Sequence, residues 1–111
     1  EIRAKGLTAP RITPQHIEAT IASEHYFNAR DAAFPGVVIA ESTAQTYEAL
    51  RLLTFRVLVL RNGFTVTGES ACASLENFDA ELGRKIARQN AVNKIWQLEG
   101  YLLKQQLSDS K

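Results

Sequence analysis

Three basic residues at helical spacing form the densest group of charges in this chain that could do chemistry. Arg84, Lys85 and Arg88 fall within five positions. A helix would set them along one side, where they could follow a phosphate backbone and bind nucleic acid with salt-dependent affinity. The alternative is a solvated helix face, because Glu81 lies four residues before Lys85 and could pair with it. No aromatic side chains alternate with the cluster, so we favour the solvated face.

The segment 68–74 is a candidate anion site, because it leads from an expected strand into an expected helix N-terminus. Free backbone amides at such a terminus bind phosphate or carboxylate groups. The hydroxyls of Ser70 and Ser74 would line this corner. The alternative, which we favour, is that Ser74 caps the helix at a tight turn and binds no ligand.

His16, Glu18, Glu24 and His25 are the residues that could hold a metal ion. Histidine and carboxylate side chains together can bind zinc, but the spacing of these four follows no known ligand pattern. Cys72 could act as a nucleophile if a base or a helix terminus stabilised its thiolate, although its expected place on the core face favours a buried thiol. A set of acid, base and nucleophile is missing. We therefore expect no metal, no cofactor and no catalysis.

The composition describes one small domain without a strong electrostatic field. The chain has 111 residues, enough for a single core, and its 13 lysines and arginines balance 12 acidic residues. No overall charge therefore draws it to nucleic acid or to an anionic membrane. Its longest apolar run, at about 52–60, is far shorter than the roughly 20 residues of a spanning helix, so we expect no membrane partner. The single cysteine fits a reducing compartment, and we infer the cytoplasm.

Four segments are expected before the most regular part of the chain. Residues 1–11 contain glycine and proline without periodicity, which predicts a flexible arm. Thr13-Pro14 is typical of a helix start, so a helix is expected from residue 14 to about 24, with a short strand at 25–27. Residues 28–50 carry Pro35-Gly36 and many small side chains, which predicts a long loop.

A β-hairpin is expected around Asn62-Gly63, which stands between two β-rich runs and is typical of a type I′ turn. A two-residue loop would place Val59 opposite Val66 and Val57 opposite Gly68, with these side chains on the core face. Arg56 would face Glu69 on the other side of the sheet. Gly68 weakens its strand unless another backbone approaches closely, and the helix that follows is the candidate.

One long helix is expected from residue 74 to about 106, with 108–111 as a tail. It carries two apolar stripes on nearly opposite sides, whereas a small sheet needs only one. The first stripe comprises Phe78, Leu82, Ile86, Val92, Trp96, Leu103 and Leu107. The second, predicted as an interface because its small residues would admit another backbone, comprises Gly83, Ala87, Ala91, Ile95, Leu98 and Leu102. Together these elements predict an α+β fold: a short N-terminal helix, an antiparallel hairpin with a candidate third strand, and a long helix packed on it within one domain, 12–107.

Seven segments carry a resemblance to a known family: 11–14, 21–27, 53–55, 57–74, 76–79, 83–88 and 94–103. Among them are Arg-Ile-Thr-Pro at 11–14, Val-Leu-Val-Leu-Arg-Asn-Gly-Phe-Thr-Val-Thr-Gly-Glu-Ser-Ala-Cys-Ala-Ser at 57–74, and Lys-Ile-Trp-Gln-Leu-Glu-Gly-Tyr-Leu-Leu at 94–103. In these segments the chain resembles the "gene product forty-nine / gene sixty-six" family of small bacteriophage and prophage proteins. Leu75 and Arg56 depart from the family's usual pattern. The resemblance implies a phage origin and action in the cytoplasm of a bacterial host, with no assigned activity.

Our leading hypothesis from the sequence is a non-enzymatic phage accessory protein that acts by protein association. Apolar area left exposed on a monomer would be a liability, so the partner is expected to be a second copy, a dimer being favoured, or a host or phage protein. One alternative is a nucleic-acid-binding regulator that uses Arg84, Lys85 and Arg88. Another is a binder of small anions at the Ser70–Ser74 corner, which could block host nucleotide signalling.

Overall fold

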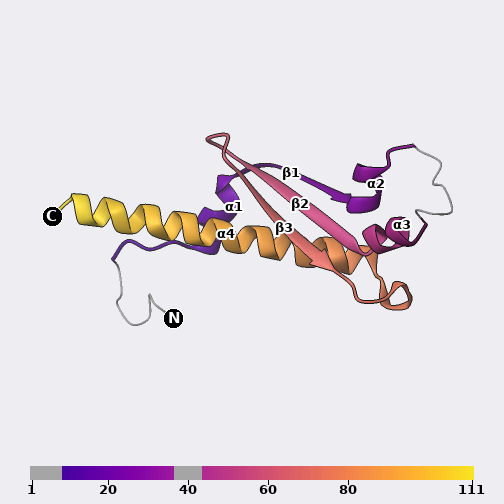
Figure 1. Cartoon of the computed structure of the whole chain (residues 1–111). Helices are drawn as coiled ribbons and strands as arrows, with labels where there is room; N and C mark the ends of the chain where they lie inside the picture. The colour runs from indigo at the N-terminus through magenta and orange to yellow at the C-terminus, as the bar shows by residue number, and fades with distance from the viewer. Residues whose placement is uncertain (1–8, 37–43) are drawn as a thin grey trace.

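The computed structural model describes residues 9–36 and 44–111, and it confirms the expected α+β fold. A three-stranded antiparallel sheet in the order β1-β2-β3 lies on one long helix, α4 (Figure 1). The elements are α1 (Pro14–Thr20), β1 (Ile21–Asn28), α2 (Ala29–Ala33), α3 (Ala44–Arg51), β2 (Leu53–Leu60), β3 (Thr65–Ala71), the 3-10 helix η2 (Leu75–Asn77) and α4 (Ala80–Asp109).

The first helix begins as expected but ends early. The hydroxyl of Thr13 accepts a hydrogen bond from the backbone N–H of His16 at 3.1 Å, and Pro14 occupies the first turn. The expected continuation to residue 24 is wrong, because β1 starts at Ile21 and pairs with β2 through seven of its eight residues. Backbone pairing with β2 makes residues 21–24 extended, because their helical pattern is short and weak.

The hairpin loop has three residues and not two. Leu60 N–H donates to the carbonyl of Phe64 at 2.8 Å, and Gly63 N–H donates to the carbonyl of Leu60 at 2.9 Å. Gly63 alone in this loop has a positive φ, 89°, whereas a type I′ turn would also need one at Asn62. Asn62 instead accepts a hydrogen bond from Phe64 N–H through its side-chain oxygen at 3.0 Å.

The extra loop residue shifts the register of β2 against β3 by one. Leu58 lies opposite Val66 and Val59 lies opposite Thr65, which overturns the expected pairing. A shift of one residue exchanges the two faces of a strand. Leu58 and Leu60 are therefore buried, together with Thr54 of the same strand.

The predicted ion pair between Arg56 and Glu69 is wrong for the same reason. Arg56 lies opposite Gly68, while Glu69 lies opposite Phe55 on the far face of the sheet. The guanidinium of Arg56 pairs with the carboxylate of Glu24 on β1 at 2.7 Å.

Helix α4 begins later and ends later than expected. Its N-cap is Asp79, whose carboxylate accepts a hydrogen bond from Leu82 N–H at 3.1 Å, while Ser74 precedes the short helix η2. The helix continues to Asp109, so it includes the first two residues of the expected tail 108–111. Gly68 meets it closely, as predicted: a Cβ at this position would overlap the carbonyl oxygen of Ala87 and the backbone of Ala91.

The stripe predicted as an interface is corrected by its burial. Gly83, Ala87, Ala91 and Ile95 are buried within the molecule, where α4 packs against β2 and β3. Their small side chains admit the molecule's own sheet rather than a partner. Only the last two residues of that stripe, Leu98 and Leu102, are exposed, where α4 extends past the sheet. Of the other stripe, Leu82, Ile86, Trp96 and Leu107 are exposed, whereas Val92 is buried in the core.

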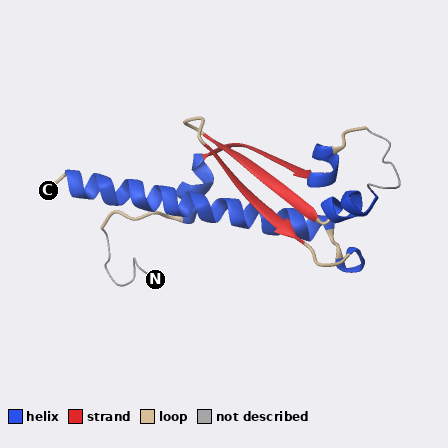
Figure 2. Ribbon diagram, in the orientation of Figure 1, coloured by secondary structure: helices blue, strands red, loops and turns tan. Residues whose placement is uncertain are grey.

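The segment predicted as a loop at 28–50 contains two short helices in its described part. Asn28 caps α2 by accepting a hydrogen bond from Arg30 N–H at 2.9 Å, and α3 ends directly before β2. The two helices lie together at the end of the sheet where α4 begins (Figure 2). Residues 37–43 and most of the predicted arm 1–11 lie outside the described residues.

Candidate functional site

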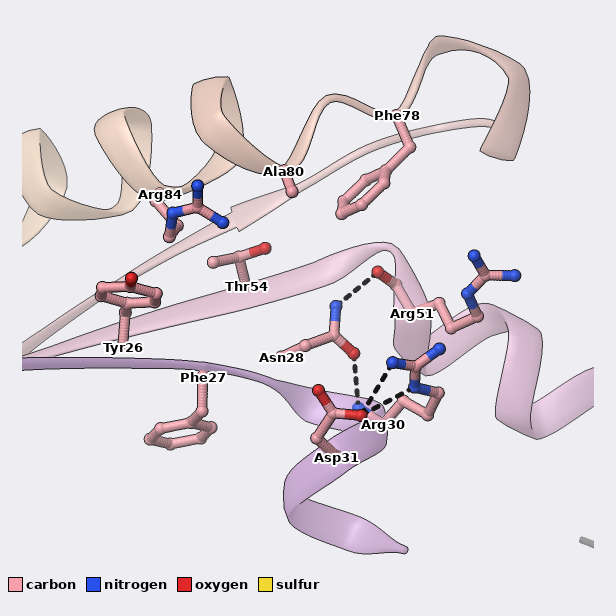
Figure 3. A pocket seen from close by; sticks show the side chains of 10 residues that line it. All are labelled: Tyr26, Phe27, Asn28, Arg30, Asp31, Arg51, Thr54, Phe78, Ala80 and Arg84. Atoms are coloured by element: carbon pink, nitrogen blue, oxygen red, sulfur yellow. Dashed lines mark hydrogen bonds and ion pairs between the residues drawn. The ribbon is translucent and has the colours of Figure 1, made fainter. Parts of the chain in front are cut away.

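A cavity of about 370 Å³ opens at the end of the sheet where α4 begins, between β1, α2 and the first turn of the long helix (Figure 3). This volume is within the range of small-molecule sites. We call it the arginine pocket. It is lined by Tyr26, Phe27, Asn28, Arg30, Asp31, Arg51, Thr54, Phe78, Ala80 and Arg84.

A tyrosine between two guanidinium groups forms one wall of the arginine pocket. The guanidinium carbons of Arg84, on α4, and Arg56, on β2, each lie 5.1 Å from the centre of the Tyr26 ring. A cation over an aromatic face is attracted by the ring's quadrupole. The contact therefore holds the Arg84 guanidinium beside the cavity, where Figure 3 shows it above the ring.

Arg84 is the arginine of the pocket whose guanidinium pairs with no carboxylate among residues 9–36 and 44–111. Arg30 pairs with Asp31 at 2.8 Å, and Arg51 pairs with Glu48 at 3.0 Å. The hydrogen bond to Asp31 raises the pKa of Arg30 further above its usual range. An anion that enters the pocket would meet Arg84 as a free bidentate donor.

The polar floor of the pocket also fixes its shape. The side-chain amide of Asn28 donates to the backbone carbonyl of Arg51 at 2.6 Å and accepts from Arg30 N–H, which joins the ends of β1, α2 and α3. Thr54, 5% exposed, lies beneath the cavity on β2. Phe78 supplies a second aromatic ring from the segment before α4, and its side chain points into the cavity in Figure 3.

A second charged cluster beside the pocket is balanced within itself. Arg88 pairs with Glu24 at 2.7 Å and with Glu18 at 2.8 Å, and Arg56 pairs with the same Glu24. The hydrogen bonds to Glu24 and then Glu18 raise the pKa of Arg88, and the hydrogen bond from Arg88 is the largest cause of the lowered pKa of Glu24. This cluster joins α1, β1, β2 and α4.

The predicted nucleic-acid contact is thus divided among three environments. Arg84 lies against Tyr26, Arg88 is occupied by two glutamates, and Lys85 is exposed. A phosphate backbone would have to compete with Glu18 and Glu24 for Arg88. The three side chains do not form one free basic surface.

The predicted anion corner does not form around Ser70 and Ser74. Four residues, 75–78, separate Ser74 from the N-cap of α4, and Ser74 itself makes no side-chain capping hydrogen bond. Its carbonyl accepts a hydrogen bond from the thiol of half-buried Cys72 at 3.1 Å.

The histidines have ordinary partners in the described chain. His16 hydrogen-bonds to Glu99 of α4, and His25 lies 3.1 Å from the hydroxyl of Ser23. No group of three metal-ligating side chains is present among the residues that the structure describes. Over the same residues, no helix is long and apolar enough to cross a membrane.

Sequence reasoning missed most of the arginine pocket. It identified Arg84 but neither Tyr26 nor Phe78, because these residues lie about fifty positions apart and meet only through the sheet. One available signal was the placement of Tyr26 directly after Glu24 and His25 in a β-rich run. An alternating strand puts Glu24 and Tyr26 on one face, toward the arginines of α4.

The comparisons define the class and then the family. The geometry describes a small α+β protein with a long terminal helix and a pocket lined by arginines and aromatic side chains. The model of the phage protein (N4 Gp49/phage Sf6 gene 66) family matches residues 12–107, and the chain belongs to this family. Searches of curated proteins and of solved structures found no match.

Proposed function

We propose that this phage protein is non-catalytic and acts by binding, with a small anion of the nucleotide class in the arginine pocket. The observation that carries the proposal is Arg84, a guanidinium held by Tyr26 beside a cavity and free of any carboxylate partner in the described chain. A protein that bound a host nucleotide in this way would lower its free concentration in the host cytoplasm.

The pocket offers both halves of the recognition that a nucleotide needs. Arginine binds phosphate in a bidentate geometry. The rings of Tyr26 and Phe78 provide apolar surface for a base, and Asn28 and Thr54 add hydrogen-bonding groups at the floor. The pocket lacks a nucleophile paired with a base, which favours binding without turnover.

Titration calorimetry with the four ribonucleoside monophosphates tests this proposal. We expect at least one to bind with a dissociation constant below 1 mM, roughly 4 kcal/mol of binding free energy, and to remain unchanged after incubation. Arg84→Ala should weaken that binding about tenfold or more, because the charge on the phosphate loses its partner. Lys85→Ala is the matched control, since Lys85 neighbours Arg84 but lies outside the pocket. Absence of heat with all four nucleotides, or equal affinity in both variants, would contradict the proposal.

A second candidate function is self-association through the outer side of α4. Leu82, Ile86, Trp96 and Leu107 lie exposed along α4, with Leu82 and Ile86 beside the corner that follows β3. Several large apolar side chains exposed along one helix are typical of a contact surface rather than of a monomer's solvent face. We propose that a second copy of the chain covers them.

Sedimentation equilibrium tests self-association. We expect wild-type protein to form dimers at tens of micromolar, and Ile86→Lys to raise the dissociation constant at least tenfold because it places a charge in the contact. Tyr101→Lys is the control, since Tyr101 is 72% exposed on another side of α4. A wild-type monomer at 500 µM would exclude a dimer of this kind.

A further inference from the structure

We infer that the ligand of the arginine pocket carries a terminal phosphate, which is a phosphate monoester, and that Thr54 binds this phosphate together with Arg84 and the first turn of α4. The inference rests on the proposed function and adds to it the position of the anion and the class of nucleotide. Nucleoside 5′-monophosphates belong to this class, whereas cyclic nucleotides do not, because their phosphate is a diester.

Thr54 has a buried hydroxyl that the rest of the protein does not use. The residue is 5% exposed, and its hydroxyl makes no hydrogen bond to any residue of 9–36 or 44–111. A buried polar group without a partner costs stability, and a valine of the same shape would avoid that cost. The fold therefore gives no reason for a hydroxyl at this position, whereas a ligand that hydrogen-bonds to it does.

The hydroxyl lies on the side of Thr54 that faces α4. A Cβ built at Gly83 would lie 3.2 Å from the hydroxyl oxygen, so the glycine leaves the space around this oxygen open. Arg84 is the next residue of the helix. Figure 3 shows the Thr54 side chain between β2 and the two lining residues of α4, Ala80 and Arg84. An anion in this part of the cavity would meet a hydroxyl from the strand and a guanidinium from the helix.

The first turn of α4 adds a third donor. Ala80 is the first residue of this 30-residue helix, and it lines the cavity. The first amides of a helix lack partners within it, and the helix dipole favours an anion at this end. The N-cap carboxylate of Asp79 accepts a hydrogen bond from Leu82 N–H and is not part of the cavity lining, so it leaves the amide of Ala80 to a ligand.

A terminal phosphate matches this set of donors. It offers three free oxygens and a charge between about −1.5 and −2 at pH 7, whereas a diester has fewer free oxygens and a smaller charge. The Arg84 guanidinium can bind two phosphate oxygens side by side, which leaves the remaining oxygen to the hydroxyl of Thr54 and the amide of Ala80. The carboxylate of the lining, Asp31, is paired with Arg30 at 2.8 Å, so its charge is balanced.

Titration calorimetry with each nucleoside 5′-monophosphate and its 3′,5′-cyclic counterpart tests the selectivity. We expect the best-binding 5′-monophosphate to bind at least about tenfold more tightly than its cyclic form, because the diester lacks an oxygen for one of the donors. Thr54→Val should weaken binding of the 5′-monophosphate about tenfold and change that of the cyclic form less than about twofold. Thr54→Ser keeps the hydroxyl and should restore the binding.

A second measurement separates this role from a structural one. Ligand-free Thr54→Val should melt at the same temperature as wild type or above it, because the buried hydroxyl that it removes has no partner in the described chain. Thr67→Val is the matched control for both measurements, since Thr67 is exposed on β3 and lies outside the arginine pocket. It should leave the affinity for either form of the nucleotide unchanged.

The results separate the inference from the proposed function. Binding of a 5′-monophosphate that depends on Arg84 but not on Thr54, or equal affinity for the cyclic form, would overturn the inference and leave the proposed function standing. A lower melting temperature of ligand-free Thr54→Val would show that the hydroxyl has a partner within the protein, which would also overturn the inference. Absence of binding by all four 5′-monophosphates would overturn both.

Discussion

At the scale of single residues, the missing side chain of Gly68 sets the distance between sheet and helix. A Cβ there would overlap backbone atoms of Ala87 and lie 3.0 Å from Cα of Ala91, and backbone cannot rotate away as a side chain can. Gly68→Ala should therefore destabilise the protein by about 3 kcal/mol, at the upper end of overpacking effects. Urea unfolding measures the change.

Gly100→Ala is the matched control for that measurement. No atom lies within 4 Å of a Cβ built at Gly100, which is an exposed interior position of α4. The substitution should stabilise the protein by up to about 1 kcal/mol through helix propensity. Equal effects of the two substitutions would show that α4 does not lie against Gly68 in solution.

The cluster around Glu24 gives a pH dependence with a definite sign. The hydrogen bond from Arg88 lowers the pKa of Glu24 in the folded protein below its ordinary 4.5. The stabilisation is therefore complete above about pH 4.5 and is lost as the pH falls through the lower, folded-state pKa. Wild-type protein should lose stability in that acid range, as followed by thermal melting between pH 7 and pH 2.5.

Glu24→Gln should remove this part of the acid dependence. At pH 7 the variant should be less stable by about 1 kcal/mol, since the cluster is partly exposed. Glu81→Gln is the control, because Glu81 is an exposed glutamate in the first turn of α4. If Glu24→Gln and wild type lost the same stability between pH 4.5 and pH 2.5, this account of Glu24 would be wrong.

Residue-level predictions succeeded where a cause is local. Thr13 caps α1, and Gly68 admits α4, because both effects follow from a few neighbouring residues. The partners of Arg84 and Arg88 could not be predicted in this way. Tyr26 and Glu24 come from a strand about sixty residues earlier, and only the pairing of β1 with β2 brings them to the helix.

At the scale of elements, one loop residue decides which face of β2 is buried. The sequence predicted both strands and the turn between them, and it placed Val66 and Gly68 on the core face. The expected register put the wrong face of β2 in the core, because Asn-Gly fits both a two-residue loop and the three-residue loop that forms. The two loops shift the register of β2 against β3 by one residue, and no neighbouring residue in the sequence indicates which loop forms.

Gly63 provides a test of this loop. Its φ of 89° lies where L-residues are strained, and a Cβ there would meet no neighbouring atom within 4 Å. Gly63→Ala should therefore destabilise the protein by about 1–2 kcal/mol through backbone strain alone. Asn62→Ala should cost less, about 1 kcal/mol, by removing its hydrogen bond to Phe64 N–H. Chemical unfolding compares them, and a harmless Gly63→Ala would argue against this loop.

The two stripes of α4 show the limit of periodicity as a guide. The spacing correctly predicted two apolar sides, but the small residues were assigned to a partner. Small side chains indicate close approach by some backbone, and here that backbone belongs to β3. The deciding fact is that Gly68 lies opposite Ala87 and Ala91, which is a tertiary contact and not a pattern along the helix.

At the scale of the whole molecule, the chain is too extended to cover its own apolar surface. Its radius of gyration is 18.9 Å, whereas a compact domain of this length would have about 13 Å. The cause is α4, whose C-terminal half extends past the sheet with Leu98 and Leu102 exposed (Figure 1). The strands of the sheet have seven or eight residues, so the sheet is shorter than the 30-residue helix and leaves its C-terminal half uncovered.

Small-angle scattering tests the proposed dimer at the scale of the whole molecule, because its length depends on the relative direction of the two α4 helices. The monomer is 63 Å long, of which α4 accounts for about 45 Å, and the remainder lies at the end that holds the arginine pocket. Antiparallel pairing would put one such end at each extremity, so the dimer should measure about 80 Å. A parallel pair would stay close to the monomer's length. Ile86→Lys should return both the mass and the length to those of the monomer, and a wild-type particle with the mass of a monomer would contradict self-association.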